Sequence, residues 1–108
     1  MPPTSRDPNN NSLNAIFSAL AHSTRRRILL ALHQNGGSLT AGDIAGRFNQ
    51  AWPTTTRHLR ILENANLLRQ ERVGRSRLYR IESDVFYIVR KWIEDIGSQP
   101  ALNEAEAV

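Results

Sequence analysis

The chain has 108 residues, of which 40% are hydrophobic and 22% charged, with 14 basic and 10 acidic side chains and no cysteine. This length allows one domain with one modest core, and the lack of cysteine excludes disulfides, thiolate metal sites and a thiol redox switch. No apolar run approaches the roughly 20 residues that a membrane span requires, and the polar N-terminus is neither a signal nor a transit peptide, so we expect a cytoplasmic protein without membrane contact.

Four helices are predicted in the first part of the chain. Residues 1–11 are polar and rich in proline and asparagine, and we expect a disordered arm. Ser12 is a good N-cap for a first helix with an apolar stripe. Ser23 or Thr24 would cap a second helix, which Gly36 and Gly37 end.

A capping box formed by Thr40 and Asp43 predicts a short third helix. Pro53 is acceptable only in the first turn of a fourth helix, which is predicted to run over 53–65. Thr55, Leu59 and Leu62 recur at helical spacing and form its predicted buried stripe.

The period then changes to the alternation of strands. Residues 68–82 alternate around Gly74 and Arg75, a pair that suits a two-residue hairpin turn, with Tyr79 and Ile81 on the core side. A last helix from about Asp84 to Ile96 follows, and residues 98–108 form a predicted flexible tail. The domain is therefore predicted over 12–97: mainly α with a small β-hairpin, in the order α-α-α-α-β-β-α, which is a winged helix-turn-helix.

The positive charge of the chain lies in one segment. Residues 52–82 contain seven arginines and three glutamates, while the remainder has seven basic and seven acidic residues, so the whole net charge of +4 belongs to this segment. Outward arginines on one helix are usually only solvated. Here the fourth helix and the hairpin have the same sign and face the same side, which predicts that they bind double-stranded DNA.

The third and fourth helices have the size of a helix-turn-helix pair, whose second helix enters the major groove. Arg57 is placed to read guanine, and Arg60, one turn further on, to hold phosphate. The hairpin is the wing, whose tip reaches a flanking minor groove. The predicted DNA-binding residues are Trp52, Thr54, Thr56, Arg57, His58 and Arg60 on the helix, and Arg72, Arg75, Ser76 and Arg77 on the wing.

The last helix has an apolar face that is broader than one small core can cover. A second copy would hide it together with part of the first helix, and two-fold pairing would present two recognition helices about 34–36 Å apart to a near-palindromic operator. The predicted dimer interface consists of Leu13, Ile16, Phe17, Ile88, Val89, Trp92, Ile93 and Ile96.

Four segments, "FSALAHSTRRRILLAL", "LTAGDIAGRF", "WPTTTRHLRILENANLL" and "RVGRSRLYRIE", resemble the ArsR/SmtB family of bacterial transcriptional regulators over about two-thirds of the chain. The resemblance implies a homodimeric winged helix-turn-helix repressor that pairs through its first and last helices. It also implies DNA contacts at Thr54, Thr56, Arg57 and His58 and at the arginines around Gly74.

Three departures from the family pattern stand out. The second helix opens with His22-Ser23-Thr24-Arg25 instead of Asp-Pro-Thr-Arg. Ala51 and Trp52 stand where the family often has serine and a small polar residue. Ala51 cannot supply a side-chain cap, and Trp52 packs either within its own domain or on DNA.

The third departure concerns the ligand. Metal-sensing members use a cysteine pair in the third helix or Asp, His and Glu sets on the last. Here "AGDIAGRF" has no thiol, the last helix has Asp84, Glu94 and Asp95 but no histidine, and His22, His33 and His58 lie on different predicted elements. We therefore expect no metal site and no cofactor, and His58 is a groove or helix-packing residue.

Two other classes of function are alternatives to DNA binding. A winged helix can also serve as a protein-interaction module, whose basic surface would then meet an acidic partner. An enzyme is disfavoured because the sequence has no supported Ser-His-Asp arrangement, Gly-rich phosphate loop or convergent carboxylate pair. Release from DNA by a small molecule, by a partner protein or by dilution alone is left open.

Overall fold

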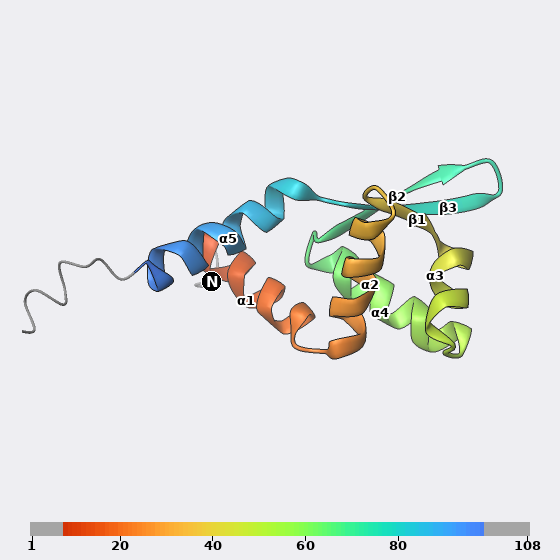
Figure 1. Ribbon diagram of the computed structural model, residues 1–108, viewed down its shortest axis with the longest axis horizontal. Helices are drawn as coiled ribbons and strands as arrows, with labels where there is room; N and C mark the ends of the chain where they lie inside the picture. Colours follow the sequence, from red (N-terminus) through yellow and green to blue (C-terminus); the bar gives the residue numbers. More distant parts are fainter. Residues whose placement is uncertain (1–7, 99–108) are drawn as a thin grey trace, which may run out of the picture.

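The computed structural model describes residues 8–98, which form five helices and three strands (Figure 1). The three strands form one antiparallel sheet in the order β1-β3-β2. The elements are α1 (Pro8–Leu20), α2 (Ser23–Gln34), β1 (Ser38–Thr40), α3 (Ala41–Phe48), α4 (Trp52–Asn64), β2 (Leu68–Val73), β3 (Ser76–Ile81) and α5 (Ser83–Gly97). The predicted class, a mainly helical winged helix-turn-helix, is confirmed. Most of the predicted arm and tail lies outside the described residues.

The starts of the first helices differ in detail from the prediction. Helix α1 begins at Pro8 rather than after Ser12, because proline fits the first helical turn. Helix α2 is capped by His22, whose Nδ1 accepts the backbone N–H of Thr24 at 3.2 Å, and not by Ser23 or Thr24. Imidazole nitrogen is a less common cap than a hydroxyl, so the propensity rule selected the wrong residue.

The start of α3 follows the prediction. The Thr40 hydroxyl oxygen accepts the backbone N–H of Asp43 at 3.1 Å and so satisfies one of the unpaired donors of the first turn.

Strand β1 was not predicted. Its three residues pair with β3 in the register Ser38↔Arg80, Leu39↔Tyr79 and Thr40↔Leu78. A segment this short shows no readable alternation. It is a strand because its backbone groups satisfy the free edge of β3. The element order is therefore α-α-β-α-α-β-β-α.

The hairpin has the predicted two-residue turn. Val73 faces Ser76 in the ladder, which leaves Gly74 and Arg75 as the connection. Gly74 has φ +63°, the left-handed value that the first position of such a turn requires and that glycine adopts without a steric penalty.

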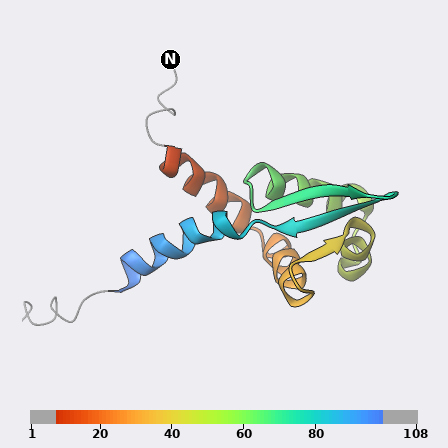
Figure 2. The same ribbon diagram turned by 90° about the horizontal axis from the view of Figure 1, so that it is seen from above.

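The core lies where α1, α2 and α4 pack beneath the sheet, and it contains Ile28, Leu32, Ile44, Leu67 and Leu68 among its fully buried side chains. Figure 2 shows that α5 leaves this body at one end, while the hairpin tip projects at the other.

Two residues of the predicted dimer interface belong instead to the core of the single chain. Ile16 is 0% exposed and Val89 8%, so pairing with a second copy would bury almost no further surface of either. On α5 the residues further along the same face, Trp92, Ile93 and Ile96, remain exposed.

The start of α4 offers a stability test. Ala51 is its N-cap and makes no side-chain hydrogen bond. A serine there would accept an N–H of the first turn, so we expect Ala51→Ser to raise the free energy of unfolding by about 0.5–1 kcal/mol. Urea denaturation measures the change. Ala51→Val, which adds bulk but no acceptor, should give no gain, and an equal gain in both variants would contradict the capping explanation.

Candidate nucleic-acid interface

Packing of one face of α4 decides which of its side chains point outward. The helix follows α3 after a short turn in which Asn49 adopts the left-handed conformation with φ 47° and ψ 43°. Thr55, Leu59 and Leu62 are buried, as predicted. On the other side of α4, three side chains of the predicted DNA-binding set are exposed: Thr54, Arg57 and Arg60.

Thr56 lies between these two faces. It is half-buried, and its hydroxyl oxygen is covered without a hydrogen-bond partner, like that of Thr55. A covered polar atom without a hydrogen bond lowers the stability of the folded protein, because its lost contact with water is not replaced. Thr56 is one of the residues that line the hollow between α4 and the hairpin.

His58 departs from its predicted place at a groove. Its side chain is only 5% exposed and counts among the buried residues of α4. Because it follows Thr55 by three residues and precedes Leu62 by four, it shares the inner stripe of the helix. A base contact by this side chain is therefore excluded in this conformation, and the alternative expectation, a helix-packing role, describes its position.

A small polar cluster surrounds His58. Its Nδ1 lies 3.2 Å from Nη1 of Arg25 on α2, and its ring centroid lies 4.6 Å from that of His22. A guanidinium can only donate, so Nδ1 accepts and the neutral ring has its proton on Nε2. Burial lowers the pKa of His58, and the nearby His22, Arg25 and Arg57 lower it further.

The hairpin places exposed residues at its tip and ion pairs at its base. The exposed side chains of the predicted wing contacts are Arg72, Arg75, Ser76 and Arg77. Nearer the body, Arg69 Nε lies 3.7 Å from Glu82 Oε2, and Arg80 Nη2 lies 3.2 Å from Glu71 Oε2. The hairpin acids therefore neutralise cations at the base, and the positive charge remains towards the tip.

Trp52 joins the two elements of the surface. It is the first residue of α4 and is 53% exposed. Together with Gly42 at the start of α3 and Arg75 and Arg77 of the wing, it lines a shallow hollow of about 330 Å³. Its own domain covers about half of the side chain and the other half is exposed beside the wing, so packing within the domain is partial and a contact with DNA stays a prediction.

Among residues 8–98, no group of three or more His, Asp or Glu side chains is placed to hold a metal ion. Within the same residues, every helix is too short or too polar to cross a bilayer.

An exposed helix surface of hydroxyls and arginines beside a basic hairpin defines a winged helix-turn-helix protein of the DNA-binding kind. The comparisons agree. A family model described as a helix-turn-helix domain matches residues 20–71. The transcriptional repressor SdpR of Bacillus subtilis (strain 168) is 37% identical over 81 residues, which are 75% of this chain and 88% of that protein.

Solved structures agree as well. The crystal structure of an ArsR family transcriptional regulator has a TM-score of 0.73 and 34% identity, covering 82% of this chain and 89% of that one. A Mycobacterium bovis domain, described as a homodimeric winged helix-turn-helix DNA-binding domain, has a TM-score of 0.68 and 21% identity, covering 94% and 92%. The chain belongs to the ArsR family of winged helix-turn-helix transcriptional regulators, as the sequence resemblance predicted, and these relatives favour DNA binding over a protein-interaction module.

The cluster around His58 predicts a pH dependence of stability. The pKa of His58 is below its ordinary value of 6.5 in the folded protein, so the unfolded chain takes up this proton first as the pH falls. The contribution to stability is complete above about pH 6.5 and is lost progressively below it. We expect the free energy of unfolding to decrease below pH 6.5 and to decrease less steeply in His58→Gln, whose amide oxygen still accepts from Arg25.

The measurement is chemical denaturation at a series of pH values between about 7.5 and 5. His33→Gln is the matched control, because His33 is exposed near the end of α2 and no contact with this cluster is recorded for it. If His33→Gln flattened the profile and His58→Gln did not, the assignment to His58 would be wrong.

Proposed function

We propose that the protein is a homodimeric transcriptional repressor that binds a near-palindromic operator in double-stranded DNA in the bacterial cytoplasm, by binding alone and without catalysis. One observation carries this proposal: the exposed face of α4 and the basic tip of the β2–β3 hairpin lie on the same side, with Trp52 between them. The similarity to a transcriptional repressor of B. subtilis supports repression as the outcome of binding.

The exposed residues divide into two roles. Thr54 and Arg57, in the first turns of α4, enter the major groove, where a guanidinium can bind the O6 and N7 atoms of guanine together. Arg60, Arg72, Arg75 and Arg77 contact phosphates or the flanking minor groove, and these contacts supply affinity rather than sequence preference.

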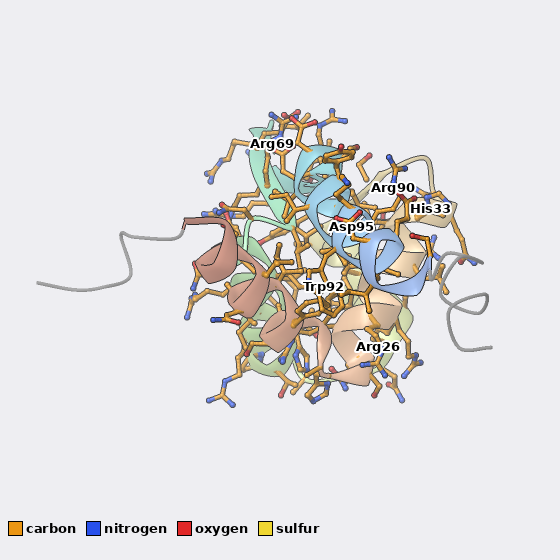
Figure 3. All side chains as sticks on the ribbon, turned by 90° about the vertical axis from the view of Figure 1, so that its left-hand side faces the viewer. Arg26, His33, Arg69, Arg90, Trp92 and Asp95 are labelled. Atoms are coloured by element: carbon orange, nitrogen blue, oxygen red, sulfur yellow. The ribbon has the colours of Figure 1, made fainter. Side chains whose placement is uncertain are left out.

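Dimer formation is supported by the accessible apolar side chains at the opposite end of the molecule. On α5, Trp92 is 43%, Ile93 52% and Ile96 61% exposed. Phe17 of α1 meets the Trp92 ring edge-on, with centroids 5.3 Å apart. Figure 3 looks onto this face, with Trp92 near its middle and the labelled basic side chains further out. A contiguous apolar face with a polar rim is typical of an interface.

The face continues into a hollow at the base of α5. The hollow has a volume of about 380 Å³, and Leu20, Leu29, Leu30 and Phe86 supply most of its apolar lining. Leu30 is exposed in the single chain. We assign the hollow to the same surface, because a second copy that covers α5 would also cover its rim, as expected for the two-fold pairing of the homodimeric M. bovis domain.

Base reading is tested on an operator selected from bound genomic fragments. Arg57→Ala should weaken operator binding by about 1–3 kcal/mol and relax the base preference at one position, because the bidentate contact is lost. Competition among operators with single base changes measures both effects. Arg90→Ala, first shown by sedimentation velocity to remain dimeric, is the control: this exposed arginine pairs with Glu94 on α5, away from the hairpin tip. Equal binding of both variants would refute the role of Arg57.

The dimer is tested by two aspartate substitutions on one helix. Ile93→Asp places a charge on the apolar face of α5 and should give a monomer that binds the operator much more weakly. Tyr87→Asp is matched in exposure, 53% against 52%, but lies about 120° around α5 from Ile93, and it should remain dimeric. Sedimentation velocity measures both, and a dimeric Ile93→Asp protein would contradict the proposed interface.

A further inference from the structure

Within residues 8–98, one carboxylate of the cationic surface forms no ion pair with a basic side chain. Glu71 and Glu82 pair directly with arginines of the hairpin. Glu63 of α4 instead accepts hydrogen bonds from a neutral side chain, the Gln70 amide of β2. A negative charge at this place repels DNA phosphates and weakens binding. Glu63 would offset this cost if its contacts stabilise the DNA-binding surface.

The contacts of Gln70 link the recognition helix to the wing. Its Nε2 lies 3.0 Å from Oε1 and 2.9 Å from Oε2 of Glu63. Its Oε1 accepts from Nη1 of Arg77 on β3 at 2.6 Å. Because a carboxylate only accepts and a guanidinium only donates, the orientation of the amide is fixed from both sides. The result is one continuous chain of hydrogen bonds from α4 through β2 to β3.

This chain of hydrogen bonds borders a hollow between the two DNA-binding elements. The hollow has a volume of about 330 Å³, and Thr56, Arg60 and Glu63 of α4 line it opposite Gln70 and Arg77 of the hairpin. Arg60 and Arg77, both assigned to phosphate contact, thus stand on opposite walls. Phosphates on a duplex have fixed spacing, so the separation of the two walls determines whether both arginines reach the backbone together.

We propose that Glu63 and Gln70 are positioning residues, which hold Arg77 and the wing at the distance from α4 that a duplex requires without touching DNA themselves. This inference rests on the proposed DNA-binding function. It assigns to the side of the hairpin that faces α4 a role in DNA affinity besides that of the exposed arginines. It also accounts for an acid in the most basic part of the chain.

The proposal makes a prediction opposite in sign to that of simple electrostatics. Removing either Glu63 or Glu71 takes one negative charge from the DNA-binding side, which by charge alone should tighten binding in both cases. In the part of the chain that the structure describes, Glu71 pairs with Arg80 of the same hairpin and has no hydrogen bond or ion pair with α4. Glu71→Met should therefore bind DNA as tightly as the parent protein or more tightly, whereas Glu63→Met should bind about fivefold more weakly.

The experiment compares Glu63→Met, Gln70→Met and Glu71→Met, each first checked for an unchanged dimer and cooperative thermal unfolding. Each is titrated with the selected operator in two lengths. The longer duplex extends beneath both wings, and the shorter one ends at the segment covered by the two recognition helices. Gln70→Met should reproduce the loss seen in Glu63→Met without any change in charge. It should also lower the salt dependence of binding to the longer duplex, because a phosphate contact is lost.

The length of the duplex separates positioning from a general structural defect. The proposal is supported if Glu63→Met and Gln70→Met weaken binding to the longer duplex only. The same substitutions should cause no further loss of binding in a protein that already carries Arg77→Met. A loss of equal size on both lengths, or tighter binding by Glu63→Met, overturns it. Failure of the parent protein to bind any genomic fragment would instead refute the proposed function, and this would be visible before any variant is measured.

Discussion

Burial of the inner face of α4 is the constraint on which the DNA-binding surface depends. Three threonines in the first turns of this helix are weak helix formers, each costing a few tenths of a kcal/mol. Full burial of Leu59 and Leu62 contributes about 1.5–3 kcal/mol each. Packing therefore outweighs propensity and fixes the rotation of the helix, and that rotation turns Arg57 and Arg60 outward.

The consecutive arginines 25–27 show that a cationic run need not belong to the DNA surface. Arg25 donates from Nε to the Ala19 carbonyl at 2.6 Å and reaches His58 on α4. Arg26 donates to the Leu20 carbonyl at 2.7 Å, and Arg27 lies 5.4 Å from the ring centroid of Phe48. Arg25 and Arg26 therefore tie α2 to the end of α1, where they satisfy carbonyl groups, and Arg25 also reaches α4. Arg27 lies against α3.

The features that can be predicted from the sequence are those that depend on contacts between residues close together in the chain. The Thr40 cap, the turn at Gly74 and the Leu59–Leu62 stripe depend on residues a few positions apart, and local chemistry specifies them. Strand β1 and the burial of His58 depend on partners more than 30 residues away, β3 and Arg25. A helical wheel places His58 at a margin, and only the packing of α2 against α4 decides that it lies inside.

The distribution of charge pairs gives the molecule two different ends. On α5, Arg90 pairs with Glu94 and Lys91 with Asp95, each one turn apart. Exposed pairs of this type add little stability, but they cancel the field around the apolar face, where net charge would repel a second copy. At the other end the tip of the hairpin and the outer face of α4 retain unmatched arginines. The net charge of +4 is thus concentrated where a polyanion can meet it, and the uncharged face is left for association.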